Sequence, residues 1–196
     1  MADIDDYLCT AADALATVPR RAVTRLAQAI RAAWAEHRQV FLCGNGGSAA
    51  NTIHLCNDLI FGVSPKGRDG IRAIALCDNP SVMTCLANDV GYDDVFAYQL
   101  AVQARPGDLL IVMSGSGNSP NILAALRQAK ESGVRSAAIL GFDGGKARLQ
   151  ADIVVHVPIA DMQAAEDCQQ CIGHAMTKWL KAHSPVAEPA LAGHAP

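Results

Sequence analysis

The 196-residue sequence predicts an α/β fold: a doubly wound parallel sheet of five strands, preceded by an N-terminal helical arm. Short, continuous apolar runs bounded by turn residues indicate strands that are buried on both faces. Segments with apolar residues at helical spacing separate these runs, and such alternation is typical of a parallel sheet. The polar, glycine-rich loops follow the strand ends, which places them along one edge of that sheet.

Residues 3–36 carry apolar residues at helical spacing and predict two helices, broken near Thr17-Val18-Pro19. Because these helices precede the first strand, they lie outside the strand–helix alternation. Such an arm often packs against another subunit, so we expect an oligomer. The first predicted strand is 39–43, and a helix follows from about residue 49 to 60.

The middle and end of the chain continue the alternation. Ser119 reads as a helix N-cap with Pro120 at the first helical position. Residues 184–196, with three prolines and small residues, predict a disordered tail after a single domain of residues 1–183. The remaining predicted strands are 72–76, 109–113, 136–140 and 153–157, and the remaining predicted helices begin near 78–81 and span 95–104, 121–131 and 162–183.

Composition excludes several classes of protein. Apolar residues make up 51% of the chain, but no uninterrupted apolar run approaches membrane-spanning length. The N-terminus lacks a basic region followed by an apolar segment, so we expect no signal peptide and no membrane partner. The net charge of −3 argues against a surface that binds nucleic acid.

The seven cysteines are an odd number, and most fall in apolar strand or helix patterns, as Cys43, Cys77 and Cys85 do. This distribution predicts buried, reduced thiols in a cytoplasmic protein. Cys168 and Cys171 have redox-motif spacing, but they lie within a helical pattern and no second pair completes a zinc site. We interpret this pair as structural.

The loop between strand 109–113 and the next helix predicts a site for one phosphate monoester. It combines three hydroxyls and two glycines at the positive end of a helix, where backbone N–H groups favour an anion. An ordinary strand–turn–helix junction is the alternative, but the combination with a clean cap favours phosphate. The absence of a lysine excludes a nucleotide P-loop, so we expect no nucleotide. The candidate residues are Ser114, Gly115, Ser116, Asn118 and Ser119.

A second glycine-rich turn, residues 44–50, follows the first strand. It superficially suggests a dinucleotide site, but the G-x-G-x-x-G spacing fails and no acidic residue closes the second strand. A tight turn that needs glycine is the simpler interpretation. Asn45, Gly46 and Ser48 would nevertheless reach the same crevice as the serine loop, because parallel strands end at one edge.

Two helices carry candidate chemical groups. His54 and Asp58 stand four residues apart and share a helix face, although an isolated pair of this kind is more often a solvated surface. On the last helix, Asp167 and His174 are seven apart and nearly eclipsed, and Glu166 lies about 80° round from His174. With Gln170, these side chains can face one site.

Taken in order, these motifs resemble the phosphoheptose isomerases, which are SIS domain (sugar isomerase) enzymes with a flavodoxin-like sheet. The resemblance extends from about residue 3 to 183. It implies interconversion of sedoheptulose 7-phosphate and D-glycero-D-manno-heptose 7-phosphate, and a homotetramer with helices from several subunits around each site. The matching segments are Cys43 to Ala50, Asn88-Asp89, Gly91-Tyr92-Asp93, Gly107-Asp108, Ser114 to Ser119 and Asn121.

The resemblance also implies roles for residues. Ser114, Ser116 and Ser119 would hold the phosphate, and Asn45, Ser48 and Asp89 would contact the sugar. In some members of the family four positions bind zinc, one ion per site, and these correspond here to His54, Asp58, Glu166 and His174. This chain departs from the family where Asp58 replaces glutamate, Glu166 replaces glutamine, Gln169 replaces a second histidine, Gly115 replaces threonine, and Gly62 replaces an arginine whose charge Lys66 or Arg68 would have to supply.

We expect an aldose–ketose isomerisation through an enediol, with Asp58 as the base and His174 as the acid. If both residues bind zinc, Glu166 or Asp167 is the next candidate base. One alternative is an isomerase of another ketose phosphate, such as an octulose phosphate. A second is a non-catalytic SIS domain protein of the type that binds the replication initiator, and a third is an isomerase or lyase of amino sugars.

Overall fold

The computed structural model describes residues 3–64 and 69–185. Its core is one five-stranded, all-parallel sheet with the spatial order β2-β1-β3-β4-β5. The strands lie close to their predicted positions, and this confirms the fold class. They are β1 (Val40–Gly44), β2 (Ala73–Ala75), β3 (Leu109–Ser114), β4 (Arg135–Leu140) and β5 (Ile153–His156).

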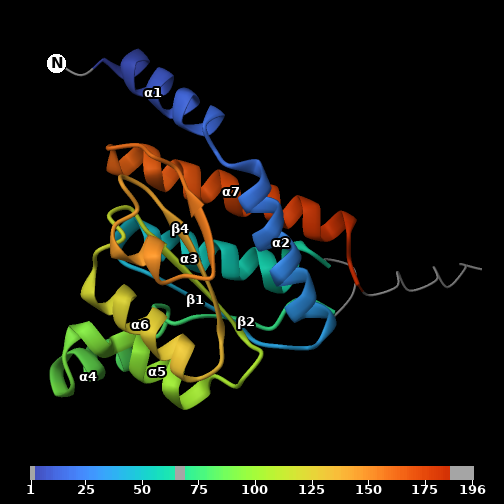
Figure 1. Cartoon of the computed structure of the whole chain (residues 1–196), viewed down its shortest axis with the longest axis vertical. Coiled ribbons are helices and arrows are strands. Elements are labelled where there is room, and N and C mark those ends of the chain that lie inside the picture. The colour runs from blue at the N-terminus through green and yellow to red at the C-terminus, as the bar shows by residue number, and fades with distance from the viewer. Residues whose placement is uncertain (1–2, 65–68, 186–196) are drawn as a thin grey trace, which may run out of the picture.

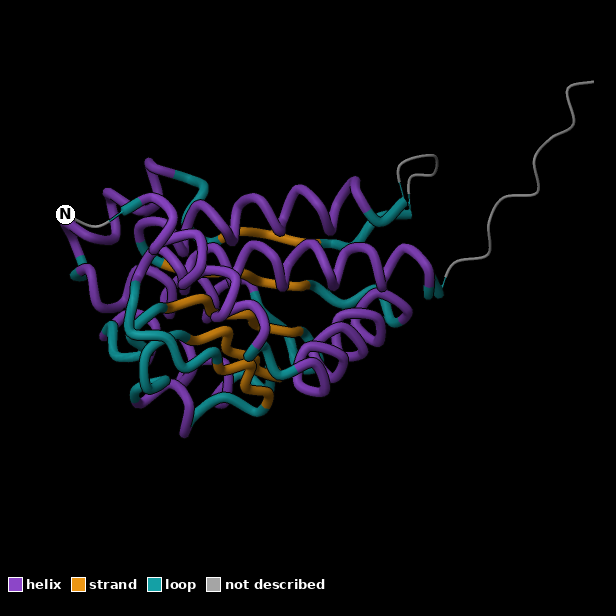
Figure 2. The backbone as a smooth tube through the Cα atoms, turned by 90° about the horizontal axis from the view of Figure 1, so that it is seen from above, coloured by secondary structure: helices purple, strands orange, loops and turns teal. Residues whose placement is uncertain are grey.

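Helices cover both faces of the sheet (Figure 1), and Figure 2 shows the strands in the interior of the molecule with helices around them. No described helix is long and apolar enough to cross a membrane. The α-helices are α1 (Ile4–Ala16), α2 (Arg20–Ala35), α3 (Gly46–Asn57), α4 (Pro80–Asp89), α5 (Val95–Gln103), α6 (Pro120–Glu131) and α7 (Met162–Ala182). The shorter elements are a π-helical turn, η1 (Asp58–Gly62), and two 3-10 turns, η2 (Tyr92–Asp94) and η3 (Lys146–Leu149).

Side chains of alternate strand residues enter two separate cores, as the period of a strand requires. Along β3, Leu109, Ile111 and Met113 face the layer of α2, α3 and α7. Leu110 and Val112 face α4, α5 and α6. Because both faces are covered, the strands are continuously apolar, which is the pattern that predicted them.

In the sheet, β2 lies on one side of β1 and β3 lies on the other. The strand order therefore reverses between β1 and β3. Ligands of open parallel sheets bind in the crevice at this point, beyond the carboxyl ends of the strands. The two polar loops predicted from the sequence follow β1 and β3. The fold therefore brings both loops to one crevice.

Two sequence expectations about local structure were wrong. The helix after β1 begins at Gly46 rather than near residue 49, because the supposed glycine turn is its first turn. Cys85 is exposed on α4 rather than buried, whereas Cys43 is buried and Cys77 half-buried. All seven thiols are free.

Thiol reactivity should follow these positions. Burial raises the pKa of the Cys43 thiol, and a hydrogen bond to Asp89 raises the pKa of the exposed Cys85 thiol. Since the thiolate is the reactive form, a disulfide reagent at pH 8 should label Cys9 and Cys171 first, then Cys85, and Cys43 only in denaturant. Mass mapping of labelled peptides over time measures this order, and early labelling of Cys43 would contradict its burial.

Candidate active site

The serine loop after β3 presents hydroxyl groups as hydrogen-bond donors. The Ser114 hydroxyl accepts from the backbone N–H of Gly117 at 3.0 Å, and the Ser116 hydroxyl accepts from that of Asn118 at 3.2 Å. Each oxygen is thus satisfied as an acceptor, and each hydroxyl hydrogen is left for a ligand. Ser119 occupies the N-cap position of α6, as predicted, but its side chain makes no capping hydrogen bond. Three hydroxyls are therefore available to an anion at this helix terminus.

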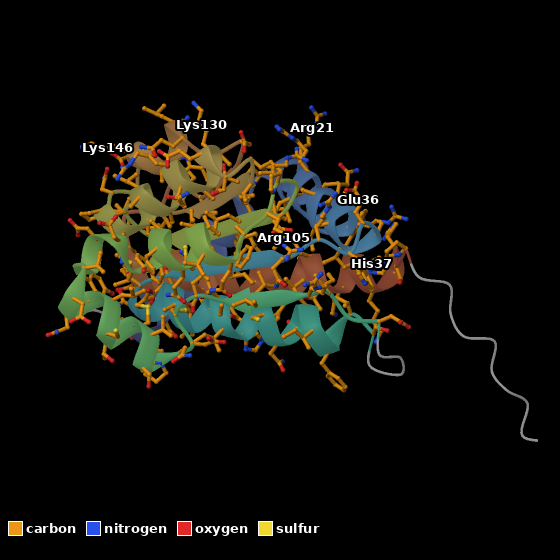
Figure 3. The ribbon with its side chains drawn as sticks, turned by 90° about the horizontal axis from the view of Figure 1, so that it is seen from below. Arg21, Glu36, His37, Arg105, Lys130 and Lys146 are labelled. Carbon is orange, nitrogen blue, oxygen red and sulfur yellow. The ribbon has the colours of Figure 1, made fainter. Side chains whose placement is uncertain are left out.

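A neighbouring loop holds the serine loop in place. Asn118 donates to the carbonyl oxygen of Ser116 and accepts from the backbone N–H of Lys146. Ala147 donates its backbone N–H to the Gly117 carbonyl at 3.0 Å. Asn118, which we predicted as a ligand contact, therefore joins the serine loop to η3. The Lys146 side chain itself lies at the outer surface (Figure 3).

Two side chains cover Gly115, one from the turn after β4 and one from the start of α7. A Cβ atom at this position would lie 2.5 Å from Sδ of Met162 and 3.5 Å from the ring of Phe142. Phe142 has φ 44°, a conformation uncommon for a side chain of its size, and its carbonyl oxygen lies 2.9 Å from Nε2 of His156. A larger residue at 115 would therefore collide with Met162.

A groove of about 640 Å³ continues from the serine loop toward β5. Ser116 and Asn118 form one wall, and Arg148 and His156 contribute basic groups. Sequence reasoning missed these two residues. The sequence signal that could have pointed to this groove is a turn that follows β4 at the same edge of the sheet, Gly141-Phe142-Asp143-Gly144-Gly145.

Three potential metal ligands converge between α3 and α7. Nε2 of His54 lies 3.0 Å from Nε2 of His174 and 3.8 Å from Oδ2 of Asp58. All three ligand atoms lie within 4.8 Å of one another. Two imidazole nitrogens and a carboxylate oxygen are ligands that zinc takes in catalytic sites, so these residues fit that ion.

The surroundings of this cluster orient its members. Asp58 begins the π-helical turn η1, and such turns are frequent at functional sites. The Thr177 hydroxyl approaches Oδ2 of Asp58 at 3.4 Å, and the Gln170 amide lies 2.8 Å from Nε2 of His174. Oδ2 of Asp58 thus faces the cluster and Thr177, which leaves Oδ1 for another partner.

Glu166 and Asp167 lie apart from the three-residue cluster. The Glu166 carboxylate covers Gly47, where an added Cβ would collide with it, and so sits at the positive end of α3. Asp167 accepts a hydrogen bond of 2.6 Å from the Tyr7 hydroxyl, and this bond raises the pKa of Tyr7 to about 12. Asp167 therefore holds α1 against α7, and its hydrogen-bond partner is Tyr7 rather than a member of the three-residue cluster.

The other predicted ligand contacts occupy varied positions. Ser48 is buried in the first turn of α3, and Gly46, with φ 56°, begins that helix. Asp89 ends α4 and accepts hydrogen bonds from Asn88 and Cys85. Gly62 lies beside Asp58, while Lys66 and Arg68 fall outside the described residues.

Asn45 joins the two loops of the crevice. Its carboxamide forms a reciprocal pair of 2.9 Å hydrogen bonds with Asn121, at the start of α6. The Tyr92 hydroxyl donates to the same amide oxygen at 3.0 Å. Asn121 and Tyr92 stood within the recognised motifs, but nothing in the sequence indicated that they contact Asn45.

A phosphate-type loop at the switch point of a parallel sheet, with an N/O metal cluster nearby, defines a sugar-phosphate-binding class of α/β domain. Comparison agrees with this class, since the SIS domain family model matches residues 6–141. A phosphoheptose isomerase of Chlorobaculum parvum is 40% identical over 170 residues, covering 84% of this chain and 81% of that protein.

Solved structures give the same result. A phosphoheptose isomerase from Francisella tularensis superposes with a TM-score of 0.86 at 26% identity, covering 91% of this chain and 96% of that one. The enzyme from Neisseria gonorrhoeae gives 0.85 at 26% identity, covering 91% and 97%. The chain belongs to the phosphoheptose isomerases of the SIS domain family, as its motifs indicated.

Proposed function

We propose that this protein interconverts sedoheptulose 7-phosphate and D-glycero-D-manno-heptose 7-phosphate through an enediol. Its family makes it a sugar-phosphate isomerase. One observation supports the reaction above all: α3 begins beside the serine loop, where Asn45 pairs with Asn121, and carries His54 of the three-residue cluster near its end. Gly46 and His54 are separated by eight residues, or about 12 Å of helix, which an extended sugar phosphate can span.

In this proposal the serine loop binds the phosphate and so positions the reacting carbons. Ser114, Ser116 and Ser119 donate their hydroxyl hydrogens to its oxygens. The α6 N-terminus adds a favourable electrostatic field. Binding energy from this remote group fixes the substrate carbonyl near the cluster, which is how a positioning group accelerates a reaction.

Asp58 is the proposed base and His174 the proposed acid. Oδ1 of Asp58, the oxygen other than the one near His54 and Thr177, takes the proton from the carbon beside the carbonyl and returns it to the neighbouring carbon. His174 moves a proton between the two oxygens of the enediol. Asp58 has a shorter side chain than the family's glutamate, so the substrate must approach α3 more closely.

His54, Asp58 and His174 would hold one zinc ion, and Glu166 is the fourth ligand that the resemblance implies. To reach the ion, the Glu166 carboxylate would have to leave Gly47. Bound there, zinc supplies a Lewis acid that polarises the substrate carbonyl. If zinc were to take both oxygens of Asp58, a Glu166 carboxylate that stays at Gly47, outside the ligand set, would be the base instead.

We also propose a homotetramer that acts in the cytoplasm. On α1, Ile4 and Leu8 are exposed, and Ile60 and Phe61 are exposed beside the cluster on η1. A monomer rarely leaves such side chains uncovered next to its site, and Figure 1 shows α1 projecting beyond the other helices. Seven free thiols favour a reducing compartment. Light scattering after gel filtration tests the assembly, and a monomer would contradict it.

The test is incubation with sedoheptulose 7-phosphate in deuterated water, followed by NMR, with added zinc or with a chelator. We expect deuterium at C2 of an aldose product, and loss of the exchange with chelator. Turnover that the chelator leaves unchanged would contradict the role proposed for zinc, but it would still support isomerase activity. Exchange with an octulose phosphate, and none with sedoheptulose 7-phosphate, would mean that the octulose phosphate is the substrate.

A further inference from the structure

We infer that Asn121 and Tyr92 position the carboxamide of Asn45 so that it offers the substrate a single N–H donor. This inference rests on the proposed function, because it concerns how the sugar is recognised. It is drawn from the hydrogen bonds around Asn45, a half-buried residue at the switch point.

The hydrogen-bonding capacity of Asn45 is almost fully used. Its Oδ1 accepts from Nδ2 of Asn121 at 2.9 Å and from the Tyr92 hydroxyl at 3.0 Å, which fills both lone pairs. Its Nδ2 gives one hydrogen to Oδ1 of Asn121 at 2.9 Å. One N–H hydrogen is left, so the side chain can donate to a ligand oxygen but cannot accept from a ligand hydroxyl.

The partners are themselves firmly placed. Asn121 is 1% exposed and is the second residue of α6, directly after the serine loop. Tyr92 belongs to η2, which follows α4. The three side chains therefore link the start of α3, the start of α6 and η2. A rigid link between the serine loop and Asn45 fixes where the sugar oxygen that Asn45 binds lies relative to the phosphate.

A lone N–H donor at this position binds a sugar oxygen that accepts a hydrogen bond, and it cannot bind a hydroxyl group that has to donate one. Because Asn121 and Tyr92 already hold the carboxamide, the donor is preorganised and need not reorient when the substrate binds. Asn121 and Tyr92 are positioning residues, because they act on the substrate through Asn45.

The test is a double-mutant cycle with Tyr92→Phe and Asn45→Ala. Loss of one hydrogen bond to Asn45 should lower kcat/KM about threefold to tenfold in Tyr92→Phe. In the Asn45→Ala background the same change should have no further effect, because Tyr92 acts through Asn45. Tyr98→Phe on α5, a tyrosine of similar exposure, is the matched control and should leave kcat/KM unchanged. Independent, multiplicative losses would overturn the inference.

Asn121→Asp provides a second, isosteric variant. A carboxylate at 121 can accept from Asn45 but cannot donate to it, so the Asn45 oxygen loses a partner. We expect a fall in kcat/KM that Asn45→Ala again masks, with an unchanged far-UV circular dichroism spectrum. A fall that persists in the Asn45→Ala background would contradict the positioning role.

A measurement without substrate separates this inference from the proposed function. The side-chain NH₂ resonances of Asn45, assigned by their loss in Asn45→Ala, should shift in Tyr92→Phe and not in Tyr98→Phe. Unmoved resonances would overturn the positioning role even in an active isomerase. Conversely, shifted resonances in a protein that turns over no heptose phosphate would support the positioning and contradict the proposed reaction.

Discussion

Asp58→Asn should lower kcat for heptose phosphate isomerisation by about 10²–10⁴-fold, the range that removal of a general base produces. The substitution keeps the shape of the side chain but removes its ability to take a proton. It also weakens the acidic member of the cluster with His54 and His174. Because the serine loop is untouched, KM should change much less than kcat. Steady-state kinetics under zinc-saturated and chelator-treated conditions measures both constants.

Three further variants show whether this loss has the proposed cause. His174→Gln should lose activity comparably, since it removes the acid. Asp58→Glu restores the family's residue and should retain far more activity than Asp58→Asn. Glu36→Gln, whose exposed carboxylate pairs with Arg38 rather than with a member of the cluster, is a charge-matched control and should behave as the wild type. Near-normal turnover in both Asp58→Asn and His174→Gln would show that neither residue is catalytic.

The strands and the position of the crevice were predictable because they depend on local patterns. Strands such as β3 are short apolar runs bounded by turn residues, and the parallel order then places every carboxyl end at one edge. The pair His54 and Asp58 was likewise visible as a four-residue spacing. Its meeting with His174 is confirmed by the cluster between α3 and α7.

The start of α3 was not predictable from propensity. Gly46 and Gly47 are poor helix formers, so the sequence favoured a turn there. The structure gives a tertiary reason for one of them, since the Glu166 carboxylate occupies the place of a side chain at position 47. Glycine at 47 therefore reflects contact with α7, 119 residues further along the chain at Glu166, rather than the local backbone.

The partners of Asp167 and Asn45 were hidden for the same reason. Asp167 has the helical phase to face His174, but the direction in which α1 crosses α7 brings Tyr7 to it instead. Asn45 and Asn121 are 76 residues apart, and their pairing depends on the spacing of β1 and β3 in the sheet. Helix periodicity fixes a face of one element but not which element covers it.

Gly117→Ala should destabilise the protein by more than the conformational cost of its φ angle alone, and should also abolish phosphate binding. Gly117 has φ 65°, which costs a residue with a Cβ about 1–2 kcal/mol. A Cβ there would also collide with the backbone carbonyl of Gly144, which cannot rotate away as a side chain could. The serine loop would have to separate from the turn that supports it, and Ser114 and Ser116 would move with it.

Gly46→Ala separates the two causes of the lost stability in Gly117→Ala, which are the strained φ angle and the collision with Gly144. Gly46 has a similar φ of 56°, but an added Cβ would meet nothing within 4 Å. Its free energy of unfolding should therefore fall only by the conformational cost of about 1–2 kcal/mol, while Gly117→Ala loses more than this. Urea unfolding of both variants measures the difference, and titration with inorganic phosphate measures binding by Gly117→Ala. Equal destabilisation would mean that the serine loop yields to the methyl group, and that its contact with Gly144 is not what holds the phosphate site in shape.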